Sequence, residues 1–81
     1  MLIAIKGLSF DGVHNYLDSR DAGEGELDIY VDDLGYVDAE AGDMRRMVEV
    51  TVNLDGDDEA FFLDVMEDLE NNEPDVEISY L

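Results

Sequence analysis

Carboxylates are the side chains that could do chemistry in this sequence, and they are densest in LDGDDEAFFLDVMEDLE, residues 54–70. That stretch holds eight Asp and Glu residues and no basic residue. Paired carboxylates can act as general acid and base, as in glycoside hydrolysis, when they lie about 5 to 9 Å apart and one of them has a pKa raised by an apolar pocket. A chain this short leaves little volume for such a cleft. We therefore expect no catalytic site here and no enzyme.

A calcium loop is the second chemistry to weigh in the same stretch. The EF-hand pattern requires glycine at the sixth position of the loop and a bidentate glutamate at the twelfth. A loop that began at Asp55 would place Ala60 and Met66 at those positions, and a start two residues earlier fits no better. The sequence therefore predicts no dedicated metal site and no cofactor.

The remaining catalytic residue types are scarce. His14 is the one histidine, and the sequence has no cysteine, so the familiar triads and metal cages that need two such residues are excluded. Gly23 and Gly25 lie in DAGEGE, which has no lysine, follows no predicted strand and would repel phosphate. A surface role for His14 is the simplest expectation.

Tyrosines are the aromatic residues that could anchor a partner, since tyrosine is enriched where proteins meet. Tyr30 and Tyr36 are surrounded by carboxylates in the sequence, which predicts exposure. Tyr16 and Tyr80 have a weaker claim, because half-buried structural rings are more common. Tyr30 and Tyr36 are therefore the candidates for apolar contact with a partner.

Composition predicts one small folded domain over residues 1–81. Of the residues, 46% are apolar, which is too many for a disordered acidic tail. The absence of cysteine fits a reducing compartment, and no apolar run reaches the roughly 18 residues that a membrane span needs. No secretory signal pattern is present at the N-terminus. We expect a cytoplasmic protein without membrane contact.

Charge is the strongest feature of the sequence. Asp and Glu number 23 against four Lys and Arg, which gives a formal net charge of -19. Such a surface repels nucleic acid and anionic lipid, and it attracts basic surfaces over a Debye length of roughly 8 Å at physiological salt. Partners should therefore be cationic proteins.

Hydrophobic periodicity predicts six elements that must hold these residues. Short apolar or alternating runs predict strands over residues 1–6, 26–31, 44–54 and 76–80. Apolar residues at helical spacing predict two helices, one after Ser9 with Phe10, Val13 and Leu17 inward, and one over residues 57–69. The segment DDLGYVDAEAGD could extend the second strand, bulge it or form a loop, and its pattern does not decide among these.

The order of these elements predicts an α+β fold, a four-stranded antiparallel sheet with two helices on one face in ferredoxin-like βαββαβ order. The uncovered face of that sheet should carry one aromatic residue and several carboxylates. RNA-binding domains of this topology instead stack bases on aromatic residues among basic ones, so the sequence argues against RNA binding. The residues expected on that face are Asp28, Tyr30, Asp32, Glu49, Thr51, Asn53, Glu77 and Ser79.

Ordered carboxylates on such a scaffold can imitate a polynucleotide. Side chains two apart on a strand lie about 6.6 Å apart, and side chains four apart on a helix about 6 Å, so rows of charge can stand in for phosphates. We expect a non-catalytic inhibitor that blocks the basic DNA- or RNA-binding groove of a nucleic-acid-handling enzyme, with no direct contact to nucleic acid. A phage or mobile-element anti-defence protein, anti-CRISPR or anti-restriction, acting in the host cytoplasm, fits this composition. The expected contact residues are Asp57, Asp64, Glu67 and Asp68 on the second helix, and Asp28, Tyr30, Asp32, Tyr36 and Glu49 on the sheet.

A second interpretation needs no specific target. Proteins of very salty cytoplasm carry acid-rich, lysine-poor surfaces, and this chain has one lysine, Lys6, and more Asp than Glu. The chain would then be a generic acidic module that mediates protein contacts. Under either interpretation two copies could pair through an exposed strand edge as a homodimer.

Overall fold

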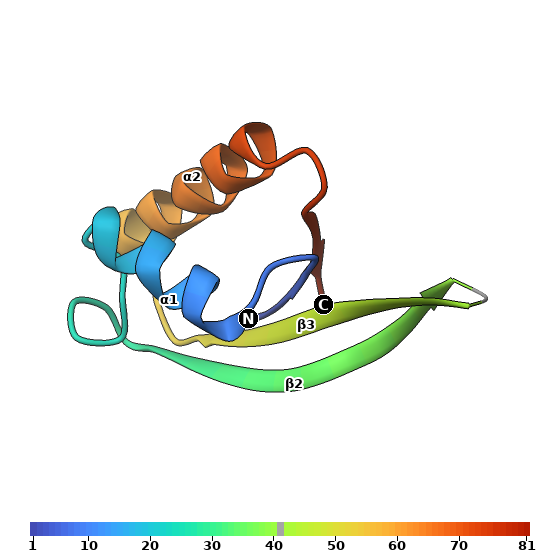
Figure 1. Cartoon of the computed structure of the whole chain (residues 1–81). Coiled ribbons are helices and arrows are strands. Elements are labelled where there is room, and N and C mark those ends of the chain that lie inside the picture. Colours follow the sequence, from blue (N-terminus) through green and yellow to red (C-terminus); the bar gives the residue numbers. More distant parts are fainter. Residues whose placement is uncertain (41) are drawn as a thin grey trace.

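The computed structural model describes residues 1–40 and 42–81, without the side chains of 38–40 and 43. In this part of the chain it has four strands and two helices (Figure 1). The elements are β1 (Leu2–Lys6), α1 (Phe10–Ser19), β2 (Ile29–Glu40), β3 (Asp43–Val52), α2 (Gly56–Asn72) and β4 (Glu77–Tyr80). The predicted order is confirmed.

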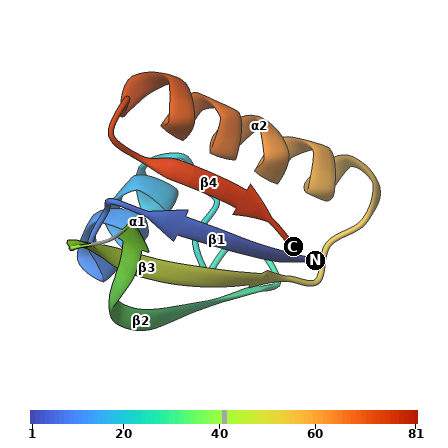
Figure 2. The same ribbon diagram turned by 90° about the vertical axis from the view of Figure 1, so that its right-hand side faces the viewer.

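The strands form one sheet in the order β2-β3-β1-β4, and each neighbouring pair is antiparallel. Each helix connects two strands that are separated by a third, which is the ferredoxin-like layout. Figure 1 shows α1 and α2 on the same side of the sheet, and Figure 2 shows α2 running beside β4. The α+β prediction with two helices on one face is confirmed.

The core lies between the sheet and the helices, where the sequence patterns place it. Alternate strand residues point toward the helices, including Ile3 and Ile5 of β1 and Val48 and Val50 of β3, and all four side chains are fully buried. The helices meet them with Val13 and Leu17 of α1 and with Phe62, Val65, Met66 and Leu69 of α2. No described polar or charged residue is buried. The carboxylates are therefore left on the surface.

Strand β2 extends far beyond the predicted residues 26–31 and is bulged. Asp33 pairs with Val48 but Tyr36 pairs with Arg46, so Leu34 and Gly35 together oppose one residue of β3. Gly35 has a φ of 71°, which suits glycine, and its N–H donates to Asp33 Oδ1 at 2.9 Å. The ambiguous segment thus extends the strand and also bulges it. The turn between the two arms includes residue 41, which lies outside the described residues.

Gly7 is the tightest backbone position between β1 and the following helix. Its φ is 95°, and a Cβ there would lie 2.7 Å from the backbone oxygen of Asp75. We expect Gly7→Ala to lower the free energy of unfolding by about 2 to 3 kcal/mol, because the strained dihedral and the backbone clash add. Gly25→Ala is the matched control, since a Cβ at that residue would meet no atom within 4 Å beyond its chain neighbours. Urea denaturation checks both, and equal losses would contradict this packing.

Candidate partner-binding surfaces

The outer face of α2 carries the densest charge in the structure. Seven acidic residues lie on this 17-residue helix, and none of its residues is basic. A helix of that length spans about 25 Å, so one carboxylate occurs per roughly 3.6 Å of axis, against one phosphate per about 3.4 Å along one DNA strand. Asp57 and Asp64 are exposed on the side opposite the core, and Glu67 is exposed on the side of the helix that faces Tyr80 of β4. The helix as a whole therefore carries a linear density of charge close to that of a DNA strand, although its seven carboxylates are spread around the helix and only part of them lie on the outer face.

The first turn of α2 explains part of this acidity. Asp57, Asp58 and Glu59 lie there, where the helix dipole favours anions by about 0.3 to 1 kcal/mol each. Asp55 is the N-cap residue, but its side chain makes no capping hydrogen bond. The dipole thus accounts for carboxylates at the start of α2 but not for those farther along, beginning with Asp64.

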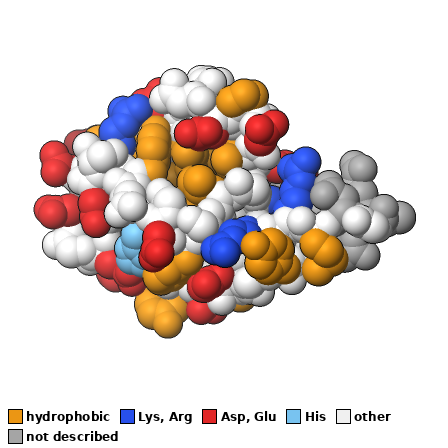
Figure 3. All heavy atoms as spheres, viewed as in Figure 1, with side chains coloured by type: hydrophobic (Ala, Val, Ile, Leu, Met, Phe, Trp, Pro, Cys, Tyr) orange, Lys and Arg blue, Asp and Glu red, His pale blue; other side chains and the backbone are white. Residues whose placement is uncertain are grey.

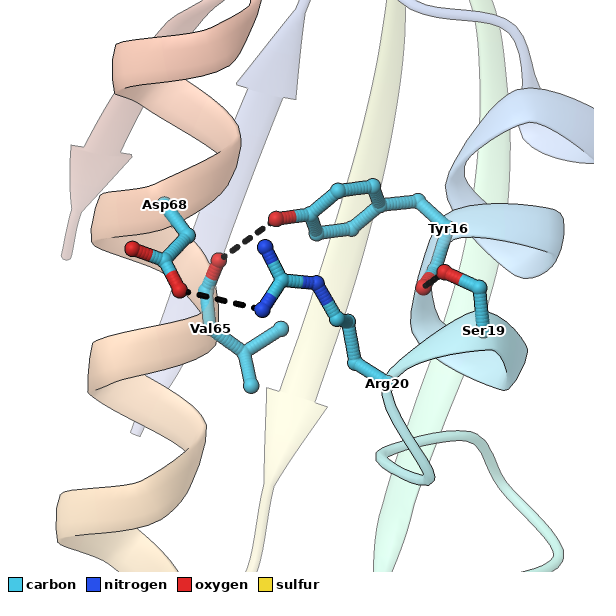
Figure 4. A network of polar contacts seen from close by, with 5 residues as sticks. All are labelled: Tyr16, Ser19, Arg20, Val65 and Asp68. Carbon is cyan, nitrogen blue, oxygen red and sulfur yellow. Dashed lines mark hydrogen bonds and ion pairs between the residues drawn. The ribbon is translucent and has the colours of Figure 1, made fainter.

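Asp68 differs from the other predicted residues of α2 because it is paired. Arg20, just after α1, donates from Nη1 to Asp68 Oδ2 at 3.1 Å, and its guanidinium lies 5.3 Å from the centre of the Tyr16 ring (Figure 4). The Tyr16 hydroxyl in turn donates to the carbonyl of Val65 at 3.5 Å. This network connects α1 to α2, and Arg20 partly neutralises the charge of Asp68, which therefore contributes less free charge than its neighbours.

We expect the Arg20–Asp68 pair to contribute little to stability. Both side chains are about half exposed, and exposed ion pairs typically contribute about 0.2 to 1 kcal/mol. A double-mutant cycle of Arg20→Met and Asp68→Asn, followed by urea denaturation, should give a coupling energy of about 0.5 kcal/mol. A coupling above about 2 kcal/mol would show that this pair is a main support of the helical layer.

The open face of the sheet gathers three of the residues that we predicted to contact a partner. Tyr30, Asp32 and Glu49 lie on the face away from the helices, and Asp32 is directly opposite Glu49 in the β2–β3 ladder. Like charges at such a position destabilise a sheet. Asp28 lies just before β2, exposed, and its carbonyl accepts from the Asn53 N–H at 3.0 Å. Charge on this face is therefore negative but sparse.

Tyr36 lies on the other side of the sheet from Tyr30. The extra residue in the bulge turns it toward the face that carries the helices, out on the projecting part of the β2–β3 hairpin. Its ring lies 5.2 Å from the Arg46 guanidinium, and Arg46 Nε donates to its hydroxyl at 3.2 Å. This hydrogen bond raises the pKa of Arg46 above its ordinary value, and electrostatic attraction to the Tyr36 oxygen raises it further. Tyr30 and Tyr36 therefore cannot both contact one flat surface of a partner.

Three of the four basic residues, all except Arg20, lie at one end of the sheet, which the sequence analysis did not predict. Lys6 ends β1, and Arg45 and Arg46 lie near the start of β3, where the Gly7 N–H donates to the Arg46 carbonyl. Arg45 Nη1 donates to the carbonyl of Asp75 at 3.4 Å. Figure 3 shows basic side chains beside the hairpin, and acidic side chains that are most numerous toward the opposite end, where basic ones occur as well. The strand register, which the sequence does not state, brings these residues together.

His14 takes a structural position. Its Nε2 lies 3.1 Å from Glu24 Oε1, and the other oxygen of Glu24 accepts from the Val31 N–H at 3.4 Å on the outer edge of β2. The His14 ring also meets Phe10 edge to face, with centres 4.5 Å apart. This carboxylate thus blocks part of an exposed strand edge, and His14 orients it.

The sequence analysis also did not predict the groove between α2 and β4. It has a volume of about 490 Å³ and is lined by Met1, Leu63, Glu67, Glu70 and Tyr80. Burial raises the pKa of the Tyr80 phenol, and the charges of Glu70 and Glu67 raise it further. Its lining comes from both ends of the chain and from one side of a helix. The only signal in the sequence was the alternation that places Tyr80 on the covered face of the last strand.

Comparison of the chain with protein-family models, with curated proteins and with solved structures gave no match. In the part of the chain that the structure describes, no three His, Asp or Glu side chains converge as the ligands of a metal ion would. No described helix combines the length and apolar character needed to cross a bilayer.

Proposed function

We propose that this protein is a non-catalytic inhibitor whose helix α2 takes the place of a nucleic-acid strand in the basic groove of a DNA- or RNA-handling protein. In this proposal it is a phage or mobile-element protein that counters host defence, of the anti-CRISPR or anti-restriction class. The observation that carries it is the concentration of seven carboxylates on the 17 residues of α2, with no basic residue among them, which gives a charge per length close to that of one strand of DNA.

Rigid placement of those carboxylates supports the proposal. A mimic gains affinity when its charges already lie in fixed positions, since less conformational entropy is lost on binding. Phe62 and Met66 are fully buried on the inner side of α2, and Val65 and Leu69 are nearly so. The backbone that carries Asp57 and Asp64 is therefore anchored to the core.

The outer face of α2 fits this role better than the open face of the sheet. The two surfaces lie on opposite sides of a two-layer fold, so one groove cannot contact both at once (Figure 1). The sheet face mixes Asp32, Glu49 and Glu77 with Lys6, Met47 and neutral residues. Helix α2 carries seven carboxylates and no basic residue of its own.

Charge reversal on α2 tests the proposal. The immobilised chain is incubated with bacterial lysate at low salt, and mass spectrometry identifies the proteins that a salt step elutes. We expect Asp57→Lys with Asp64→Lys to weaken binding to the recovered nucleic-acid-handling protein at least tenfold, because two attractive contacts become repulsive. A mixture of ribosomal and other basic proteins without a preferred target would indicate simple ion exchange.

The matched control reverses the same number of charges on the other surface. Asp32→Lys with Glu49→Lys leaves α2 intact and should change the affinity by no more than about threefold, through the long-range field alone. An equal loss in both double variants would mean that net charge, and not the face of α2, determines binding.

A further inference from the structure

Strand β4 has an unpaired outer edge. It is an end strand of the sheet among the described residues, and it pairs with β1 on its inner side. The Leu81 N–H donates to the Leu2 carbonyl at 2.8 Å. Because hydrogen-bonded residues alternate along an antiparallel ladder, the backbone groups of Ser79 and Glu77 also point inward, toward β1. The backbone N–H and C=O groups of Ile78 and Tyr80 therefore point outward, where a further strand could pair with them.

The groove beside this edge is apolar at its base and acidic at its rim. Tyr80, Leu63 and Met1 supply apolar surface, and Tyr80 is 49% exposed. Glu67 and Glu70 are both exposed on α2 along the groove. They are three residues apart on the helix, so their side chains are neighbours about 5 to 6 Å apart.

We propose that the edge of β4 and this groove bind an extended basic segment of the partner protein by strand addition. Residues of the added strand opposite Ile78 and Tyr80 would project to the helical side, into the groove. Alternate residues of a strand lie about 6.6 Å apart, close to the spacing of Glu67 and Glu70. Arg or Lys at these two positions would meet a carboxylate each, and one could lie over the Tyr80 ring.

The acidic residues along this edge favour a basic segment of a partner over a second copy of the chain. Glu77, on β4 itself, and the neighbouring Glu67 and Glu70 would face the same residues of another copy, and both copies carry a large negative charge. Like charges along an edge oppose pairing of identical strands. The inference depends on the proposed function only for the class of partner, a basic protein, and not for the role of α2's outer face.

Peptide titration of the full chain tests this inference. The probe is acetylated, amidated Arg-Val-Arg-Val-Arg, added to the ¹⁵N-labelled protein in about 150 mM salt, where long-range attraction is screened. We expect the amide signals of Ile78 and Tyr80 to move. The same peptide N-methylated on alternate residues keeps its charges but cannot pair along one edge, and we expect it to bind at least tenfold more weakly.

Two double variants that each remove two charges from α2 distinguish binding in the groove from general electrostatic attraction. Glu67→Gln with Glu70→Gln should weaken peptide binding about tenfold, as the loss of two ion pairs implies. Asp57→Asn with Asp64→Asn removes the same charge from the outer face and should weaken it no more than about threefold.

Three results would overturn strand addition: unchanged β4 amides, equal binding of the N-methylated peptide, or β4 shifts that depend on protein concentration without peptide, which would mean that a second copy covers the edge. None of them affects the charge-reversal assay on Asp57 and Asp64, so the two proposals can fail separately.

Discussion

Replacement of Phe62 by alanine should leave much of the chain unfolded at 25 °C. Phe62 is the largest fully buried side chain, and truncation of such a residue costs about 3 to 5 kcal/mol through lost burial and the cavity that remains. A domain of 81 residues has a total stability of about 4 to 12 kcal/mol, and the net charge of -19 lowers it further by self-repulsion. Circular dichroism with urea denaturation measures the loss.

Phe61 provides the matched control for Phe62. It is the adjacent residue of the same type, but it is 42% exposed on the side of α2. Phe61→Ala should therefore cost less than about 1 kcal/mol. Similar losses for the two variants would contradict the described packing of α2.

The same two variants separate charge from geometry in binding. Phe62→Ala keeps all carboxylates, so a partner that responds only to net charge would still bind it. We expect its binding to the target to fall in proportion to the unfolded fraction, whereas Phe61→Ala should bind nearly as the wild type does.

Salt should weaken binding steeply without weakening the fold. If about four carboxylates of α2 each replace one phosphate in the partner's groove, and if each releases counterions as a phosphate does, the counterion relation gives a loss of about a hundredfold between 50 and 200 mM salt. Calorimetry or fluorescence anisotropy at several salt concentrations measures the slope. A slope near zero would mean that apolar contacts, and not the acidic row, carry the affinity.

The generic halophilic interpretation predicts a different response to salt. An acidic surface adapted to very salty cytoplasm should give a fold that fails in dilute buffer and gains stability into molar salt. The inhibitor proposal requires a folded chain at ordinary ionic strength, where electrostatic binding operates. Urea denaturation in about 0.1 M and about 2 M salt therefore distinguishes the two accounts.

Periodicity predicted the elements of this fold because each element buries one face. The alternation of Val48, Val50 and Val52 and the helical spacing of Phe62, Val65, Met66 and Leu69 both report burial, and the structure confirms them. Burial patterns do not show how residues pair across a ladder, so the sequence left the bulge at Leu34 and Gly35 as one of three alternatives for this segment. One extra residue was enough to place Tyr36 on the opposite face from Tyr30.

The candidate surfaces were predicted in part for the same reason. Exposure of Asp57, Asp64 and Glu67 follows from the pattern of α2 itself. The pairing of Asp68 with Arg20 depends on how two helices pack, and the groove between Tyr80, Met1 and α2 depends on the joining of both chain ends in the sheet. Such contacts arise from tertiary structure, and no local pattern of the sequence contains them.

Competition with DNA tests the central claim most directly. The recovered target is first bound to a fluorescent duplex, and the wild-type chain is then added at constant salt. We predict release of the duplex with one chain bound per groove, and no release by the Asp57→Lys, Asp64→Lys variant at the same concentration. A ternary complex in which the target holds the duplex and the chain together would contradict the proposal that α2 occupies the nucleic-acid groove.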